Sequence, residues 1–348
     1  MGEKRLSVML FRTVTVLILG AVLFIAAWFG WQWYAIQSED IEFRNGDLMI
    51  RGTLLTPRFT DQTPAVVLVH GSGETSRKST LPYAWIFASQ GYAALAFDKR
   101  GVALSDGGEH EWREFNFEDL AGDAAAGYRA LQGRPRVDPR RVGFFGASQG
   151  AWVVSLAATQ ADSPAFLIMV SASVSTVAED RKFGREAQVR HAGFDDKAVA
   201  EAAELIDLDH WVTRSGTGFE ALEAAWNRYR DADWFDEVYA GEAPEAVSDP
   251  HRLWERTVLD FDPQPKLQSI SAPVLWVFGD PDLDRFAPVR LSITRLKQAI
   301  DGGKPYDIIQ IDGAGHTLEL EGGNGLRSVV EVRLPLIRRM FAWLEDPG

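Results

Sequence analysis

The stretch RVGFFGASQGAWVVSLAAT, residues 141–159, carries the strongest structural signal in this sequence of 348 residues. The apolar run Val142–Phe145 is followed by Gly146-Ala147-Ser148-Gln149-Gly150, and then by an apolar segment from Ala151 to Thr159. This order predicts a strand, a sharp turn with a serine at its tip, and a helix. The flanking glycines permit a strained backbone, because they lack a Cβ atom. Ser148 is therefore a candidate nucleophile; the alternative is an ordinary glycine-rich turn with a capping serine.

A nucleophilic serine needs a histidine base and an acid that orients the histidine. We predict His316 as the base, because it ends the motif Gly313-Ala314-Gly315-His316 directly after the last predicted strand. The acid is expected after the apolar run Val274–Phe278, which Asp280, Asp282 and Asp284 follow. Asp282 is the first choice, because a short loop past the strand lets it reach back toward the histidine, and Asp284 is the second.

An oxyanion hole needs two backbone N–H groups aimed at the developing negative charge. The N–H of Gln149 is the first candidate, because it directly follows Ser148. The second is expected from His70-Gly71-Ser72-Gly73, after the apolar run Ala65–Val69; we choose Ser72, with Gly71 as the alternative. A phosphate site is disfavoured, since this loop has neither G-x-G-x-x-G nor the lysine-serine pair of a phosphate-binding loop.

The composition argues against several classes of function. A net charge of −13 and an isoelectric point near 5.0 disfavour nucleic-acid binding, which needs a basic surface. Cysteine is absent, which excludes disulfides and thiolate metal sites. His191, His210 and His251 are interpreted as structural, and no pair of histidines has metal-ligand spacing. We therefore expect no catalytic metal and no cofactor.

The N-terminal segment Thr13–Ile36 is uncharged and almost wholly apolar, with aromatic residues gathered at its far end. A helix rising about 1.5 Å per residue would cross a hydrocarbon layer about 30 Å thick with this length. Basic residues precede the segment and acidic residues follow it, so the positive-inside rule predicts a single-pass membrane protein. Residues 1–12 are expected in the cytoplasm, 13–36 as an uncleaved anchor, and the catalytic part on the outer (periplasmic or extracellular) side. A cleaved signal peptide is the alternative, disfavoured by the length and by the lack of a cleavage site.

Apolar runs alternate with helical patterns in most of the remaining chain, which predicts an α/β fold with a mostly parallel sheet and helices on both faces. Residues 178–265 break this alternation, because they hold helical patterns but no clear strand. We expect an α/β core of residues 37–177 and 266–348, and a helical cap of residues 178–265 over the carboxyl ends of the strands. Most tryptophans of this cap, which holds Trp211, Trp226, Trp234 and Trp254, are expected to pack inside it, and one or two to line an acyl pocket.

These segments together resemble the α/β-hydrolase superfamily, and more narrowly its bacterial carboxylesterase and serine-aminopeptidase-like branch. The resemblance runs from about Ile41 to the C-terminus and rests on Val69-His70-Gly71-Ser72-Gly73, Phe97-Asp98-Lys99-Arg100-Gly101-Val102, Val137–Gly143, Gly146–Gly150, Gly279-Asp280-Pro281-Asp282 and Gly315-His316. It implies an α/β-hydrolase fold that hydrolyses carboxylic esters without a cofactor. It also supports Asp282 as the acid and implies that Asp98 and Arg100 brace the active-site loop. Ala103 departs from the pattern, because relatives tend to have glycine there.

We therefore predict a carboxylesterase-like serine hydrolase that cleaves small or medium carboxylic esters through an acyl-enzyme on Ser148. Two alternatives stay open: an amidase or peptidase with the same triad, and a non-catalytic, membrane-tethered binding protein on the same fold.

Overall fold

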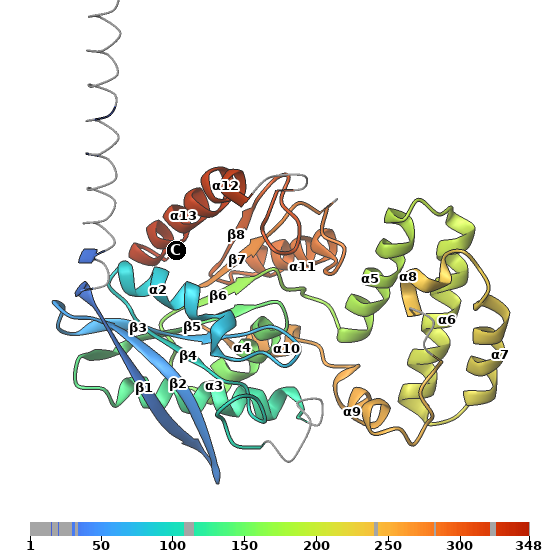
Figure 1. Ribbon diagram of the computed structural model, residues 1–348, viewed down its shortest axis with the longest axis horizontal. Helices are drawn as coiled ribbons and strands as arrows, with labels where there is room; N and C mark the ends of the chain where they lie inside the picture. The colour runs from blue at the N-terminus through green and yellow to red at the C-terminus, as the bar shows by residue number, and fades with distance from the viewer. Residues whose placement is uncertain are drawn as a thin grey trace, which may run out of the picture.

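The computed structural model describes residues 15, 20, 30–31, 34–107, 115–239, 243–281, 283–320 and 325–347. Within these residues, the centre of the fold is an eight-stranded sheet with the order β1-β2-β4-β3-β5-β6-β7-β8 (Figure 1). β1 and β2 form an antiparallel hairpin, β2 pairs antiparallel with β4, and every later pair is parallel. The strands are β1 (Ile36–Asn45), β2 (Leu48–Pro57), β3 (Thr63–Val69), β4 (Ala93–Phe97), β5 (Val137–Ala147), β6 (Leu167–Val170), β7 (Val274–Phe278) and β8 (Tyr306–Gln310).

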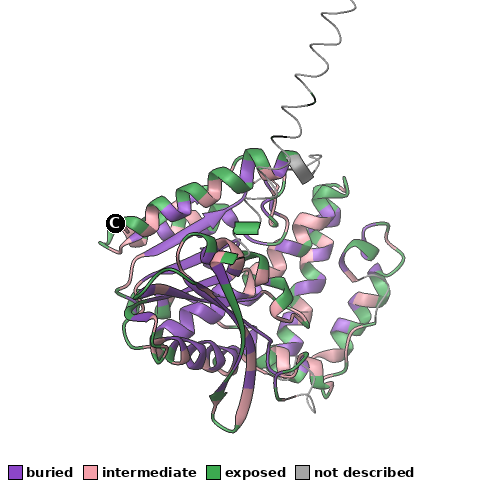
Figure 2. Ribbon diagram, turned by 60° about the vertical axis from the view of Figure 1, so that its left-hand side comes forward, coloured by how far each residue is buried: buried purple, intermediate pink, exposed green. Residues whose placement is uncertain are grey.

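Strands β4, β6 and β7 are apolar at every position because helices cover both faces of the sheet, as Figure 2 shows by burial. In β3, Ala65, Val67 and Val69 pack on one face and Val66 and Leu68 on the other. The first face carries α3 (Phe117–Gln132), α4 (Gln149–Gln160), α10 (Gln264–Ser269) and α11 (Val289–Asp301). The second face carries α2 (Leu81–Ser89), which follows the short 3-10 helix η1 (Arg77–Ser79), and the C-terminal helix α13 (Leu334–Glu345). The predicted mostly parallel α/β sheet is confirmed.

The C-terminal helical segment changes its geometry directly before Pro335. It starts as α12 (Gly325–Ser328), passes through the π-helical segment η3 (Val329–Arg333), and continues as α13. Proline has no N–H to donate to the carbonyl four residues earlier, and the wider π turn lies directly before it.

The predicted anchor, residues 13–36, lies almost wholly outside the described residues. One of its bounds is corrected: Ile36 is the first residue of β1, where it pairs with Pro57 and is buried in the apolar core of the sheet. Among the residues that the structure describes, none of the helices combines the length and the apolarity that a membrane crossing requires.

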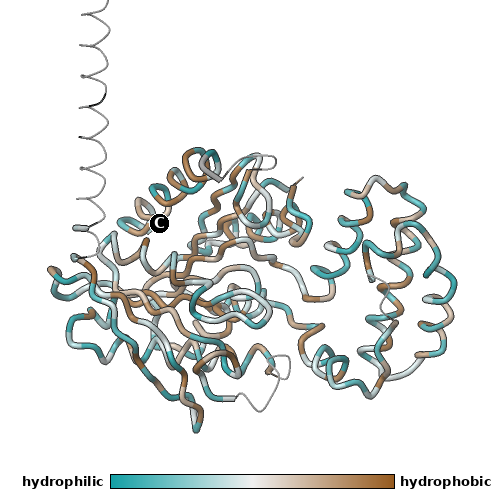
Figure 3. Tube along the Cα trace, in the orientation of Figure 1, coloured by the Kyte–Doolittle hydropathy of each residue, from teal (hydrophilic) through white to brown (hydrophobic). Residues whose placement is uncertain are grey.

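A group of helices between β6 and β7 stands beside the core, at the right of Figure 1. It comprises α5 (Val177–His191), α6 (Asp196–Ser215), α7 (Phe219–Tyr229), α8 (Phe235–Tyr239) and α9 (Pro250–Val258). Its own apolar core includes Trp234, with Trp226 packed against it, whereas Trp211 is 58% exposed. In Figure 3, hydrophilic and hydrophobic residues alternate along these helices, which stand apart from the sheet.

Candidate active site

Ser148 lies at the sharp turn between β5 and α4, with φ +53° and ψ −125°. A positive φ is uncommon for a residue with a Cβ atom and is maintained only by surrounding contacts. Here the Ser148 N–H donates to the carbonyl of Val170 at 2.8 Å, and the Ser148 carbonyl accepts from the Ala151 N–H at 2.9 Å. These bonds anchor the turn to β6 and to α4, so the hydroxyl is held above the end of the sheet.

The two glycines of the turn are required by close backbone contacts. A Cβ atom at Gly146 would lie 2.5 Å from the Gly150 carbonyl oxygen, and one at Gly150 would lie 2.4 Å from that of Val69. Both distances are shorter than any normal non-bonded contact. Glycine therefore lets α4 start directly against β3 and β5, which puts Ser148 at the sheet edge.

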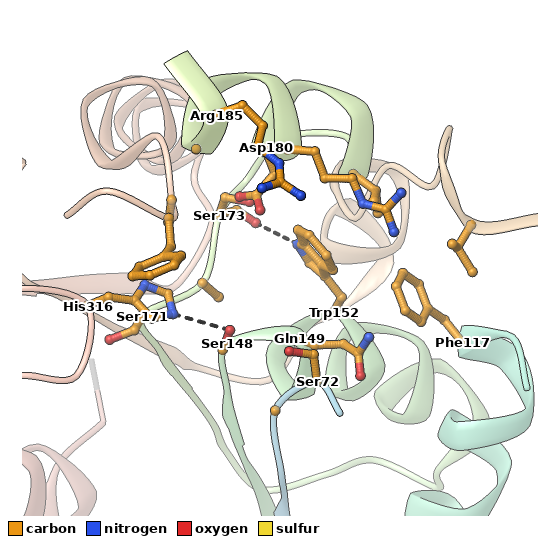
Figure 4. Close-up of a pocket in the computed structure, with 18 of the residues that line it drawn as sticks. Ser72, Phe117, Ser148, Gln149, Trp152, Ser171, Ser173, Asp180, Arg185 and His316 are labelled. Atoms are coloured by element: carbon orange, nitrogen blue, oxygen red, sulfur yellow. Dashed lines mark hydrogen bonds between the residues drawn. The ribbon is translucent and has the colours of Figure 1, made fainter. Parts of the chain in front are cut away.

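His316 and Asp284 complete a chain of contacts with the serine. The Ser148 Oγ lies 3.2 Å from His316 Nε2, and His316 Nδ1 lies 3.2 Å from each carboxylate oxygen of Asp284. Figure 4 marks the contact between Ser148 and His316 with a dashed line. Asp284 is buried, and its Oδ1 also accepts from the N–H groups of Phe286 and Ala287 at 2.9 Å. These bonds fix the carboxylate in one orientation facing the imidazole.

Asp284 therefore takes the position that we predicted for Asp282. The reason is the path of the loop after β7, where the N–H groups of Leu283 and Asp284 both donate to the Asp280 carbonyl. With this turn, the Asp284 carboxylate lies within hydrogen-bond distance of His316 Nδ1. Asp282 itself lies outside the described residues.

The N–H groups predicted for the oxyanion hole belong to residues that line one cavity with Ser148. Gly71 packs against the turn, since a Cβ atom there would lie 3.6 Å from Ser148 Cβ. Within the described residues, neither the Ser72 nor the Gln149 N–H donates a hydrogen bond to the protein. Gln149 is also the first residue of α4, and a helix N-terminus favours negative charge. Both groups are thus available to a ligand oxygen.

The cavity over Ser148 has a volume of about 840 Å³ and is lined from both the core and the cap. One part of its wall is apolar, formed by Phe117, Trp152, Val177, Trp254 and Val258. Helix α5 contributes Arg181 to the wall, together with Asp180 and Arg185, which Figure 4 labels. Burial raises the pKa of the Asp180 carboxyl to about 6.

The sequence analysis did not identify these α5 residues as part of the site. They lie more than 30 residues after Ser148 in the chain, and no motif links them to it. Of the four cap tryptophans, of which one or two are expected to line an acyl pocket, Trp254 lines this cavity.

His251, which we interpreted as structural, also lines the cavity and takes part in a cluster with Glu245 and Glu255. The ligand atoms of these three residues lie within 4.8 Å of one another, so the cluster could hold a metal ion. Its groups are already paired: His251 Nδ1 lies 2.7 Å from Glu245 Oε1, and Glu255 accepts from Arg181 at 2.5 Å. The cluster also links α5 to α9 through the contact of Arg181 with Glu255.

Asp98 and Arg100, expected from the resemblance to be structural, tie loops together beside the site. The Asp98 carboxylate accepts from both the backbone N–H and the guanidinium of Arg77. Arg100 forms a buried ion pair with Asp123 at 2.7 Å. Ala103, at the position where relatives tend to have glycine, has φ +52°. The loop thus keeps a backbone conformation that suits glycine.

Solved structures share this architecture. The esterase Pf2001 of Pyrococcus furiosus has a TM-score of 0.56, with 16% identity and coverage of 90% of this chain and 91% of that one. The proline iminopeptidase of Mycobacterium smegmatis also has a TM-score of 0.56, with 14% identity and coverage of 88% and 98%. These likenesses show that this chain has the α/β-hydrolase fold.

Residues 60–214 match the family described as "Serine aminopeptidase, S33". The quorum-quenching protein AidA of Acinetobacter baumannii is 26% identical over 310 residues, which are 86% of this chain and 94% of AidA. The acyltransferase drtE of Aspergillus calidoustus is 26% identical over 293 residues, or 81% of this chain and 88% of drtE. The chain therefore has the fold of α/β-hydrolases, and part of it matches a serine aminopeptidase family.

Proposed function

We propose that this protein is a serine hydrolase that cleaves small or medium carboxylic esters through an acyl-enzyme on Ser148. The observation that carries the proposal is the continuous line of contacts from Ser148 Oγ through both nitrogens of His316 to the buried carboxylate of Asp284. A serine that only caps a helix needs no such partners. The cavity above it presents an apolar wall to an acyl or alkyl group.

The reaction follows from these positions. His316 Nε2 accepts the Ser148 proton as Oγ attacks the ester carbonyl carbon, and Asp284 holds the Nδ1–H tautomer and stabilises the imidazolium. The N–H groups of Gln149 and Ser72 donate to the oxyanion of the tetrahedral intermediate. Collapse expels the alcohol, which takes its proton from His316. Water then attacks the acyl-enzyme through the same base, releasing the carboxylic acid and Ser148.

The test is hydrolysis of p-nitrophenyl esters of increasing acyl length by the full chain in detergent, beside Ser148→Ala. We expect kcat to fall by about 10⁴-fold or more in the variant. Ser155→Ala is the matched control, because Ser155 lies on the same helix but is buried and donates to Trp152 at 2.6 Å. Turnover of wild-type rate in Ser148→Ala would refute the assignment.

An amidase or peptidase with the same residues is the second candidate, favoured by the match to the serine aminopeptidase family. Comparing kcat/KM for matched p-nitrophenyl esters and p-nitroanilides decides between them, since the peptidase should process the anilide faster. A binding protein without catalysis would hydrolyse neither, and its Ser148 would not react with a fluorophosphonate.

We propose further that residues 13–36 anchor the enzyme in a membrane, with its catalytic part on the outer side. The support is the uncharged apolar sequence and its charged flanks. Release of the full chain from membranes by alkaline carbonate would refute the anchor.

A further inference from the structure

Lys99 follows β4 and is one of the largest fully buried side chains, with only 1% of its surface exposed. Burying an ammonium group is costly unless polar groups surround it. The proposed reaction gives Lys99 no role, and its burial calls for a physical reason.

The Lys99 ammonium contacts the segments that form the proposed oxyanion hole. Its Nζ donates to the carbonyl of Gly71 at 3.0 Å and to that of Gly73 at 2.9 Å. It also lies 3.4 Å from the side-chain oxygen of Gln149, the residue that follows the serine. One buried cation therefore joins the loop after β3 to the start of α4.

The contact between Lys99 and the Gly71 carbonyl sets the direction of the Ser72 N–H, because of the geometry of the peptide bond. The Gly71 carbonyl and the Ser72 N–H belong to one planar trans peptide, so they point in opposite directions. Because the carbonyl points at Lys99, the Ser72 N–H points away from it, and both Gly71 and Ser72 line the cavity with Ser148. Gly73 has φ +88°, a conformation that glycine adopts readily, and its own carbonyl accepts from the same ammonium.

We propose that Lys99 is a positioning residue that holds the Gly71–Gly73 loop so that the Ser72 N–H is aimed at the oxyanion before substrate binds. The proposal rests on the serine hydrolase function. It also gives Lys99 an electrostatic effect, since its positive charge lies behind the peptide that donates to the developing negative charge.

The charge state of Lys99 supplies a signature that a merely structural residue lacks. Burial lowers its pKa to about 8. Of the groups around it, His70 is neutral, since burial lowers its pKa to about 3, while Asp98 is paired with Arg77 and Asp123 with Arg100. The ammonium is thus expected to lose its proton as the pH rises through about 8, and kcat/KM should fall with it.

The experiment compares Lys99→Met and Lys99→Arg with the full-length wild type and with Lys78→Met, a matched change at an exposed lysine. For Lys99→Met we expect kcat to fall about 10²-fold with little change in KM, as for loss of an oxyanion donor. The inhibition constant of an aliphatic trifluoromethyl ketone, whose serine adduct places an oxyanion in the hole, should rise by a similar factor. Lys78→Met should match the wild type in both.

The pH profile is the second readout. The wild type should lose kcat/KM as the pH rises through about 8, and Lys99→Arg, which stays charged, should retain part of the activity without that alkaline limb. A folded Lys99→Met with wild-type kcat and inhibitor affinity would overturn the proposal. If neither variant folds, a wild type without the alkaline limb overturns it instead. A wild type that neither hydrolyses esters nor reacts with a fluorophosphonate shows that the hydrolase function itself fails.

Discussion

Replacing Asp284 by asparagine tests the candidate site most sharply, because it keeps the shape of the side chain and changes one proton. Asp284 Oδ1 accepts from the N–H groups of Phe286 and Ala287, so the asparagine oxygen should keep that place. The amide NH₂ then faces His316 Nδ1, which must give up its proton and accept. His316 Nε2 would carry the proton instead and would donate to Ser148, which abolishes the base.

The expected loss in kcat is about 10⁴-fold, or about 5 kcal/mol in activation free energy. The assay is steady-state hydrolysis of p-nitrophenyl butyrate, with thermal unfolding to verify the fold of the variant. Asp282→Asn is the matched control and should retain kcat within about threefold, which is well below one decade of rate. The reasoning is refuted if Asp284→Asn stays within tenfold of the wild type while Asp282→Asn loses its activity.

Three further predictions concern stability. Gly150→Ala should lower the free energy of unfolding by about 3 kcal/mol or more, because its Cβ would lie 2.4 Å from the Val69 carbonyl oxygen; urea unfolding measures this, and a neutral change would contradict the turn geometry. Ala103→Gly should raise the same free energy by about 0.5 to 1 kcal/mol, since Ala103 has φ +52°; an unchanged midpoint in a urea titration would argue against strain there. Asp180→Asn should stabilise the fold by about 1 to 3 kcal/mol above pH 6 and by little below pH 4, because burial raises the pKa of the wild-type carboxyl to about 6 and the charged form alone is penalised. Unfolding curves of both proteins at pH 4 and pH 8 check this, and a difference independent of pH would contradict it.

The sequence by itself determined the elements of the core and the order of the catalytic groups along the chain. Apolar runs such as Val274–Phe278 predict buried strands, because a parallel sheet covered on both faces has no polar side. The glycines around Ser148 predict the turn, since only residues without a Cβ atom allow α4 to start against β3. These signals are local: they depend on neighbours within a few residues.

The tertiary structure alone decided which groups meet. Asp282 and Asp284 are the same residue type on the same loop, so the sequence does not decide which of them orients the histidine. The turn at Asp280 brings Asp284 to His316. The cavity wall formed by α5 and the contact of Lys99 with Gly71 likewise join residues far apart in the chain. Such contacts depend on how helices and loops pack in three dimensions, where a loop one residue longer or shorter would present a different side chain. No periodicity or spacing in the sequence records that path.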